Sequence, residues 1–142
     1  MLAEDIDFHE VFKIRPTAMA LFTADLDFID ANEEFLRSAG YKLADLVGRN
    51  VFAVFPKMPY EPGNPLWTTL EAALTSGERH VDRLIRYDTE DPDTPGVFRE
   101  RYWSSVVTPI RGMNGHVELL ELSAREVTSI IEQFQSMQAE DD

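Results

Sequence analysis

Residues 99–127 constrain the fold of this 142-residue chain most strongly, because they predict two long strands joined by a tight turn. The first strand, residues 99–110, is rich in aromatic and β-branched side chains, which suit a half-buried pleated surface. Asn114-Gly115 indicates a type I′ turn, in which both central residues need a positive φ. In the second strand, Leu120, Leu122 and Ala124 alternate with polar residues. A sheet with one covered face and one solvated face is therefore expected.

The elements expected before this hairpin are short. They are a helix at 5–15, a small hairpin at 19–30, a helix between Asn32 as N-cap and Gly40 as terminator, helical turns at 42–47 and 51–55, a longer helix at 65–76 capped by Asn64, and a strand at 81–87. This order predicts an α+β fold with a five-stranded antiparallel sheet and helices on one face.

The C-terminal residues predict one further helix. Val127, Ile130, Phe134 and Met137 are spaced three, four and three apart, as in a coiled-coil seam. An ordinary docked helix explains this spacing equally well, since two heptads are marginal in water. We expect residues 128–142 to leave the domain and to pair with a second copy.

Charge and cysteine content limit the classes of function. The chain has 13 basic and 26 acidic residues, a net charge of -13, which repels nucleic acid and anionic membranes. It has no cysteine, which excludes disulfides, thiolate metal sites and cysteine nucleophiles. It also lacks a run of about 18 apolar residues and a signal-peptide pattern. A cytoplasmic location is expected.

Several motifs in order resemble the PAS sensory domain family. They are Ile29-Asp30-Ala31-Asn32 with Phe35-Leu36 and Gly40-Tyr41, then Leu46-Val47-Gly48-Arg49 with Val51-Phe52, then Thr108-Pro109-Ile110, Gly115-His116-Val117 and Glu126-Val127-Thr128. The resemblance implies a PAS fold, with residues 1–15 as an N-terminal flanking helix, 16–127 as the PAS domain and 128–142 as a C-terminal signalling helix. Arg86-Tyr87-Asp88 and Arg101-Tyr102-Trp103-Ser104 resemble PAS modules attached to bacterial signalling kinases and phosphatases.

The chain departs from the family at Glu126, where an Asp usually ties the sheet to the output helix by a salt bridge. Arg125 and Arg49 are both candidate partners for Glu126. We expect Glu126 and Thr128 to couple the sheet to the C-terminal helix.

The resemblance also implies which cofactors to consider. Covalent flavin and cinnamate-type chromophores need a cysteine, which this chain lacks. A haem would need a histidine near the long helix, where only His80 lies, as a junction residue. A non-covalent flavin could stack on Trp103 or Trp67. We expect no resident cofactor and no metal site, because the three histidines lack ligand spacing.

An arginine cluster predicts an anion site. The family register directs Arg86 and Arg101 to the same face as Trp103 and Ser105, where a guanidinium would suit a small carboxylate. Alternatively, these arginines pair with Asp88, Glu100 or acids on the helices and bind no ligand. The candidate pocket residues are Leu84, Arg86, Arg101, Trp103, Ser105, Val107, Leu120 and Leu122.

Apolar residues expected on the outer sheet face and the flanking helices predict a homodimer, because such residues need a cover. The candidate dimer residues are Phe8, Val11, Phe12, Ile85, Tyr102, Leu119, Ile130 and Phe134.

These observations favour a sensory and interaction domain of a bacterial signal-transduction protein, which biases its C-terminal helix between two states. The domain itself is not expected to be an enzyme, because no acid–base pair or nucleophile is in position; a parent histidine kinase or phosphatase is compatible. One alternative is a ligand-free PAS dimerisation module. Another is a small enzyme of the cone-shaped isomerase type, which starts with long helices and needs an acid inside the cone.

Overall fold

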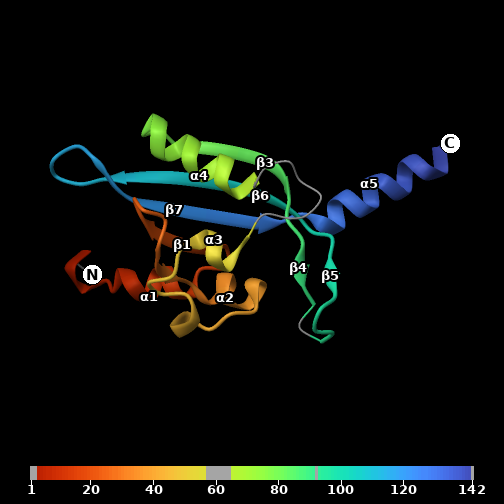
Figure 1. The fold of residues 1–142 in the computed structure, drawn as a ribbon, viewed down its shortest axis with the longest axis horizontal. Coiled ribbons are helices and arrows are strands. Elements are labelled where there is room, and N and C mark those ends of the chain that lie inside the picture. The colour runs from red at the N-terminus through yellow and green to blue at the C-terminus, as the bar shows by residue number, and fades with distance from the viewer. Residues whose placement is uncertain (1–2, 57–64, 92, 142) are drawn as a thin grey trace.

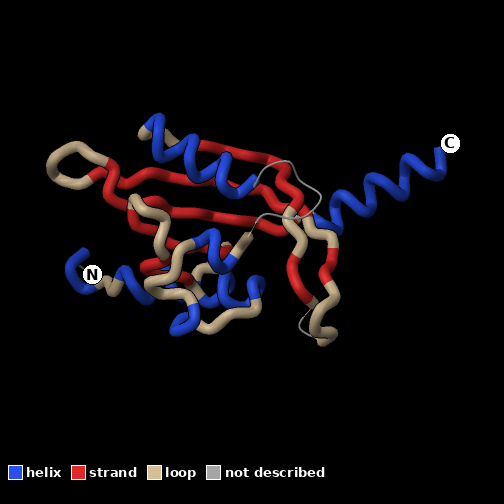
Figure 2. Tube along the Cα trace, in the orientation of Figure 1, coloured by secondary structure: helices blue, strands red, loops and turns tan. Residues whose placement is uncertain are grey.

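The computed structural model describes residues 3–56, 65–91 and 93–141, which form a mixed α+β fold (Figures 1 and 2). The main antiparallel sheet has the strand order β2-β1-β7-β6-β3. Its strands are β1 (Ala18–Thr23), β2 (Phe28–Ala31), β3 (His80–Arg86), β6 (Tyr102–Arg111) and β7 (Val117–Glu126). The predicted five-stranded sheet is confirmed.

Helices precede, interrupt and follow these strands. They are η1 (Ala3–Asp5), α1 (Phe8–Ile14), α2 (Glu33–Ala39), η2 (Leu43–Asp45), α3 (Val51–Val54), α4 (Pro65–Ser76) and α5 (Thr128–Asp141). Two short strands, β4 (Thr89–Glu90) and β5 (Phe98–Arg99), form a separate hairpin that protrudes from the main sheet (Figure 1). The predicted cap at Asn64 lies outside the described residues.

The core lies on one face of the sheet. Phe22, Val107 and Leu120 point from the strands toward Val51 of α3 and Leu70 of α4, and all five are fully buried. Burying a large apolar side chain contributes about 1.5–3 kcal/mol, so this inner face holds the helices on the sheet. The predicted placement of helices on one face is confirmed.

The central hairpin β6–β7 pairs from Trp103 opposite Glu126 to Arg111 opposite Val117. Its turn differs from the predicted type I′ turn. The N–H of Gly115 donates to the carbonyl of Gly112 at 3.0 Å, and Gly115, at φ 83°, is the turn residue with positive φ. A glycine with positive φ that follows a type I turn is the alternative way to close a hairpin.

Strand β3 contains a β-bulge that the sequence pattern does not reveal. Asp82 lies opposite Ser105, but Ile85, three residues later, lies opposite Trp103, only two residues away on β6. One extra residue in β3 reverses the direction of every side chain that follows. The expected inner position of Leu84 and outer position of Ile85 are therefore wrong: Leu84 is 52% exposed and Ile85 is 6% exposed.

The same bulge also reverses the sheet face of the next two residues relative to the prediction. Arg86 lies opposite Tyr102, and directly opposite residues share a sheet face, so Arg86 is on the outer face rather than the predicted inner face. Tyr87, expected outside, is buried.

Asn32 connects the start of α2 to β1. Its side-chain oxygen accepts from the backbone N–H of Phe35 and of Met19, each at 3.0 Å. Its amide nitrogen donates to the carbonyl of Thr17 at 2.8 Å. The predicted N-cap is confirmed, and the same side chain also fastens the helix to the sheet.

Helix α5 begins directly after β7 and extends away from the sheet (Figure 1). Ile130, Phe134 and Met137 are exposed along it. Among the described residues, no helix is long and apolar enough to cross a membrane.

Candidate ligand cavity and its link to the C-terminal helix

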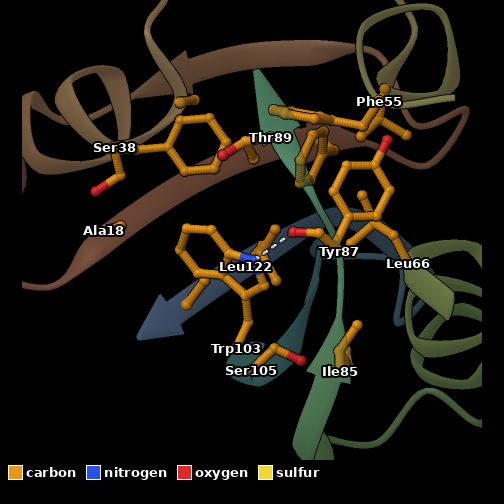
Figure 3. A pocket seen from close by; sticks show the side chains of 15 residues that line it. Ala18, Ser38, Phe55, Leu66, Ile85, Tyr87, Thr89, Trp103, Ser105 and Leu122 are labelled. Atoms are coloured by element: carbon orange, nitrogen blue, oxygen red, sulfur yellow. Dashed lines mark hydrogen bonds between the residues drawn. The ribbon is translucent and has the colours of Figure 1, made fainter. Parts of the chain in front are cut away.

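A cavity of about 80 Å³ lies between the inner face of the sheet and the helices (Figure 3). Strands β3 and β6 contribute Ile85, Trp103 and Ser105. Phe35 of α2 and Leu66 of α4 contribute on the helix side. Both layers of the domain therefore contribute walls to the cavity.

Small side chains leave this space open. Ala18 on β1, Ala124 on β7 and Ala39 on α2 all line the cavity. Protein interiors are otherwise close-packed, and large aromatic rings surround the gap: Phe55 meets Phe35 edge to face, with ring centroids 6.2 Å apart. The sequence therefore accounts for the cavity, because it places small residues between large aromatic side chains that do not fill the space.

The polar groups of the lining differ in whether they already have a partner. The Trp103 Nε1–H donates to the carbonyl of Tyr87 at 2.9 Å, drawn as the dashed line in Figure 3. The Tyr87 hydroxyl donates to the carbonyl of Pro56 at 2.6 Å. The Ser105 hydroxyl is buried and has no hydrogen-bond partner among the residues that the structure describes. Ser105 is thus the buried lining hydroxyl that remains available.

The structure brings together part of the predicted pocket set. Trp103, Ser105 and Leu122 line the cavity. Val107 and Leu120 are fully buried in the adjoining core. Leu84, Arg86 and Arg101 are not among its lining residues.

Both arginines pair with carboxylates of the protein. This agrees with the alternative in which they bind no ligand. Arg86 donates from Nη2 to Oδ2 of Asp88 at 3.1 Å and from Nε to Oδ1 at 3.3 Å. Arg101 Nη1 donates to Oε1 of Glu126 at 3.0 Å. Neither guanidinium is directed into the cavity.

Glu126 therefore pairs with Arg101, and neither Arg125 nor Arg49 takes that role. Its second oxygen, Oε2, accepts from the Thr128 hydroxyl at 2.8 Å. We name these three side chains, Arg101, Glu126 and Thr128, the junction cluster, because they join β6, β7 and α5.

The backbone of Tyr102 completes the junction. Its N–H donates to the Thr128 hydroxyl at 3.0 Å, and its carbonyl accepts from the N–H of Val127 at 2.8 Å. The next residue is Trp103, which lines the cavity. The cavity wall and the first turn of α5 are thus separated by a single peptide unit of β6.

The Tyr102 side chain lies on the outer face. Its hydroxyl donates to Glu100, and this hydrogen bond, followed by partial desolvation, raises the pKa of Tyr102 above its usual value. The outer face thus carries a small polar network of Tyr102, Glu100 and Arg86.

The predicted dimer residues are at the surface, with one exception. Phe8 of α1 and Phe134 of α5 are 67% and 58% exposed, and Val11 and Ile130 are exposed as well. Phe12, Tyr102 and Leu119 are half-buried. Ile85 is the exception, because the β3 bulge turns it into the cavity.

Sequence reasoning missed several lining residues. The alternation predicts the wrong face for Ile85 and Tyr87, because nothing in their pattern marks the bulge. Phe35 and Phe55 are apolar, but their positions in the sequence do not mark them as cavity walls. The small residues Ala18, Ala39 and Ala124, at positions that face the core, are the sequence signal that points to a cavity.

The strand order, the apolar cavity between sheet and helices, and a terminal helix that leaves from the last strand define a class, the small α+β domains built around an internal pocket. A family profile described as PAS fold matches residues 12–130. The chain belongs to the PAS-fold family.

Solved structures agree on the fold. An RNA-binding light-oxygen-voltage receptor matches with a TM-score of 0.71 and 22% identity over 93% of this chain, which spans 35% of that receptor. The PAS domain of nitrogen regulation protein NR(II) from Vibrio parahaemolyticus matches with a TM-score of 0.63 and 14% identity, covering 83% of this chain and 95% of that one. A sensory box sensor histidine kinase from Vibrio cholerae matches with a TM-score of 0.58 and 20% identity, covering 85% and 89%. At these identities the likeness establishes the fold.

Proposed function

We propose that this PAS domain is the sensory domain of a bacterial signal-transduction protein, and that occupation of its cavity changes the setting of α5. One observation carries the proposal: Trp103 lines the cavity, and the backbone of the adjacent Tyr102 accepts from the N–H of Val127 and donates to the Thr128 hydroxyl. A cytoplasmic location and an attached kinase or phosphatase belong to the same proposal, as does the division into residues 1–15, 16–127 and 128–142.

The mechanism is a shift between two packings of the domain. A molecule that fills the cavity presses on the Trp103 indole and displaces β6 relative to the helices. Because both backbone groups of Tyr102 bond to the start of α5, β6 cannot move without changing those bonds or carrying the helix with it. The ligand shifts the equilibrium by its difference in affinity for the two packings. The pair Arg101–Glu126 holds the resting arrangement.

The geometry does not support the carboxylate hypothesis for the cavity. Arg86 and Arg101 are outside the lining and already paired with acids. A carboxylate inside would be buried without a cation, which is costly. The sensory proposal is therefore retained without the anionic ligand.

The cofactors that some PAS relatives carry do not fit either. A flavin analogue sheds light on the mechanism of one solved light-oxygen-voltage domain of similar fold. The cavity here, about 80 Å³, is several times smaller than the roughly 300 Å³ at the lower end for drug-sized ligands. The described lining includes no histidine for a haem, since His80 lies elsewhere at the start of β3.

Homodimerisation is the second part of the proposal. Two separate helices, α1 and α5, each expose apolar residues, among them Phe8 and Phe134. These residues support the proposal, because a partner subunit would remove them from water. A ligand-free dimerisation module would share this feature but would leave the cavity without a role. The cone-shaped isomerase alternative loses support, because the described cavity lining includes no acid.

The sensory proposal requires that the cavity binds a small molecule, and a titration with toluene, a small neutral molecule, tests this requirement. We expect saturable, one-to-one shifts of the Trp103 indole N–H in nuclear magnetic resonance spectra, while the exposed Trp67 indole serves as an internal reference. Native mass spectrometry of freshly purified protein adds a check for a molecule that is already bound. No saturable shift with any small neutral probe, and no bound molecule, would leave only the dimerisation module.

A further inference from the structure

We propose that the cavity selects an uncharged, largely apolar molecule that carries one hydrogen-bonding group, and that Ser105 makes the selective contact. This inference rests on the proposed sensory function and adds the chemical class of the ligand. Three properties of the cavity support it: its charge, its available polar group and its size.

The first property is the absence of charge from the described lining, which includes no Asp, Glu, Lys, Arg or His. The two arginines that the sequence predicts for the pocket pair with carboxylates outside the lining, Arg86 with Asp88 and Arg101 with Glu126. An ion in this cavity would lose its hydration without gaining an opposite charge. The cavity therefore discriminates against both anions and cations.

The second property is the Ser105 hydroxyl. Ser105 is 3% exposed, lines the cavity, and has no hydrogen-bond partner among the described residues. A buried polar group without a partner is costly, and a hydroxyl can both donate and accept. Tyr87 and Trp103 already donate to carbonyls. Of the other two lining hydroxyls, Ser38 donates to Glu34 and Thr89 is only half-buried. A ligand that bonds to Ser105 satisfies the buried hydroxyl and gains an advantage over an equally sized hydrocarbon.

The third property is size. The cavity of about 80 Å³ is around half of the roughly 150 Å³ that accommodates one benzene in an engineered apolar cavity. A single small ring is therefore the upper limit, and it requires the rings of Phe55 or Trp103 to move slightly. That requirement matches the proposed mechanism, since Trp103 is the residue next to the α5 contacts.

Three single-ring probes separate these properties. Toluene and phenol match in size, but toluene has no hydrogen-bonding group and phenol has one neutral group. Benzoate is charged and slightly larger. We would titrate each at constant pH 7.5 and follow the Trp103 and Trp67 indole N–H signals. We expect phenol to bind about fivefold more tightly than toluene, the effect of one net hydrogen bond. We expect no saturable shift with benzoate.

Two single variants localise the effect. Ser105→Ala should reduce phenol affinity by about fivefold and leave toluene affinity unchanged, so that the two probes become equal. Ser104→Ala, a neighbour on the same strand that does not line the cavity, is the matched control and should change neither. Far-ultraviolet circular dichroism confirms that each variant is folded.

The outcomes separate this inference from the proposed function. If toluene and phenol bind equally to the unmodified protein, or if Ser105→Ala weakens both alike, the role of Ser105 is overturned while the cavity remains a sensor site. If benzoate binds most tightly, the uncharged class is overturned. If none of the three binds, the inference fails; if native mass spectrometry also finds no bound molecule and no other small neutral probe binds, the sensory proposal fails with it.

Discussion

At the residue scale, Asn32 is the polar side chain on which the fold depends most directly. It is 0% exposed and bonds to Met19, Phe35 and Thr17. Because β1 and α2 both contribute walls to the cavity, this one amide holds two sides of the candidate site in place.

Asn32→Ala should therefore destabilise the protein strongly. Truncation leaves buried donors and an acceptor without partners, and we expect a loss of about 2–4 kcal/mol of unfolding free energy, as each orphaned group costs about 1–3 kcal/mol. Urea denaturation followed by circular dichroism measures it. Asn114→Ala is the control, because Asn114 is exposed and accepts one bond, from the N–H of His116. Equal losses in the two variants would contradict this assignment.

Tyr102 provides a pH-dependent prediction. Its hydrogen bond to Glu100 raises the pKa of Tyr102 in the folded state. A raised folded pKa adds stability that is present below the unfolded pKa, about 10, and is lost as the pH rises through the folded pKa. We expect Glu100→Gln to lower the pKa of Tyr102, seen as an earlier tyrosinate absorbance step that Tyr102→Phe removes. An unchanged step in Glu100→Gln would refute the contact.

At the element scale, β3 shows what the sequence could and could not predict. Alternation in β7 placed Leu122 and Ala124 on the inner face, because an uninterrupted strand has a period of two. In β3 the same reasoning fails after the bulge, which reverses the faces of Leu84, Ile85, Arg86 and Tyr87. The bulge depends on how β3 pairs with β6, and that pairing is not encoded in local alternation. The carboxylate hypothesis fails at Arg86 for this reason, and it fails at Arg101 because that guanidinium pairs with Glu126.

Strand β7 offers a way to fill the cavity. Ala124→Leu adds three carbon atoms at the cavity wall, so we expect at least a tenfold loss of phenol affinity and an overpacking cost of about 1–3 kcal/mol at most. Ser123→Leu, on the opposite face of β7, is the control and should leave phenol binding intact. Unaltered binding in Ala124→Leu would place the probe outside this cavity.

The first residue of helix α5, Thr128, connects the helix to the sheet by hydrogen bonds. Thr128→Ala removes the acceptor for the Tyr102 N–H and the donor to Glu126. We expect faster amide hydrogen exchange at residues 128–131 and a modest loss of global stability, about 1 kcal/mol. Ser129→Ala, the exposed neighbour, should have no effect. If exchange at these residues is the same in both variants, Thr128 does not couple α5 to the sheet.

At the scale of the whole molecule, the domain has two surfaces that a monomer leaves open, the exposed sides of α1 and α5. The net charge of -13 opposes association at low salt, so a dimer must be held by apolar contacts. We expect a dimer in sedimentation at high micromolar concentration and 0.15 M salt.

Phe134→Glu should weaken that dimer at least tenfold, since it places a charge on the apolar side of α5. Gln135→Glu adds the same charge at the neighbouring exposed position and is the control. A protein that is monomeric at these concentrations would contradict the homodimer.

The central claim is that the cavity and α5 are coupled, and a single titration tests it most directly. We would add phenol to the isotopically labelled protein and record the Trp103 indole N–H, which reports on the cavity, together with the Val127 N–H, which donates to Tyr102 at the start of α5. The account predicts that both signals shift with the same midpoint, and that Ser105→Ala moves both midpoints equally. A Trp103 signal that shifts and saturates while the Val127 signal stays in place would show that the cavity binds without signalling to α5.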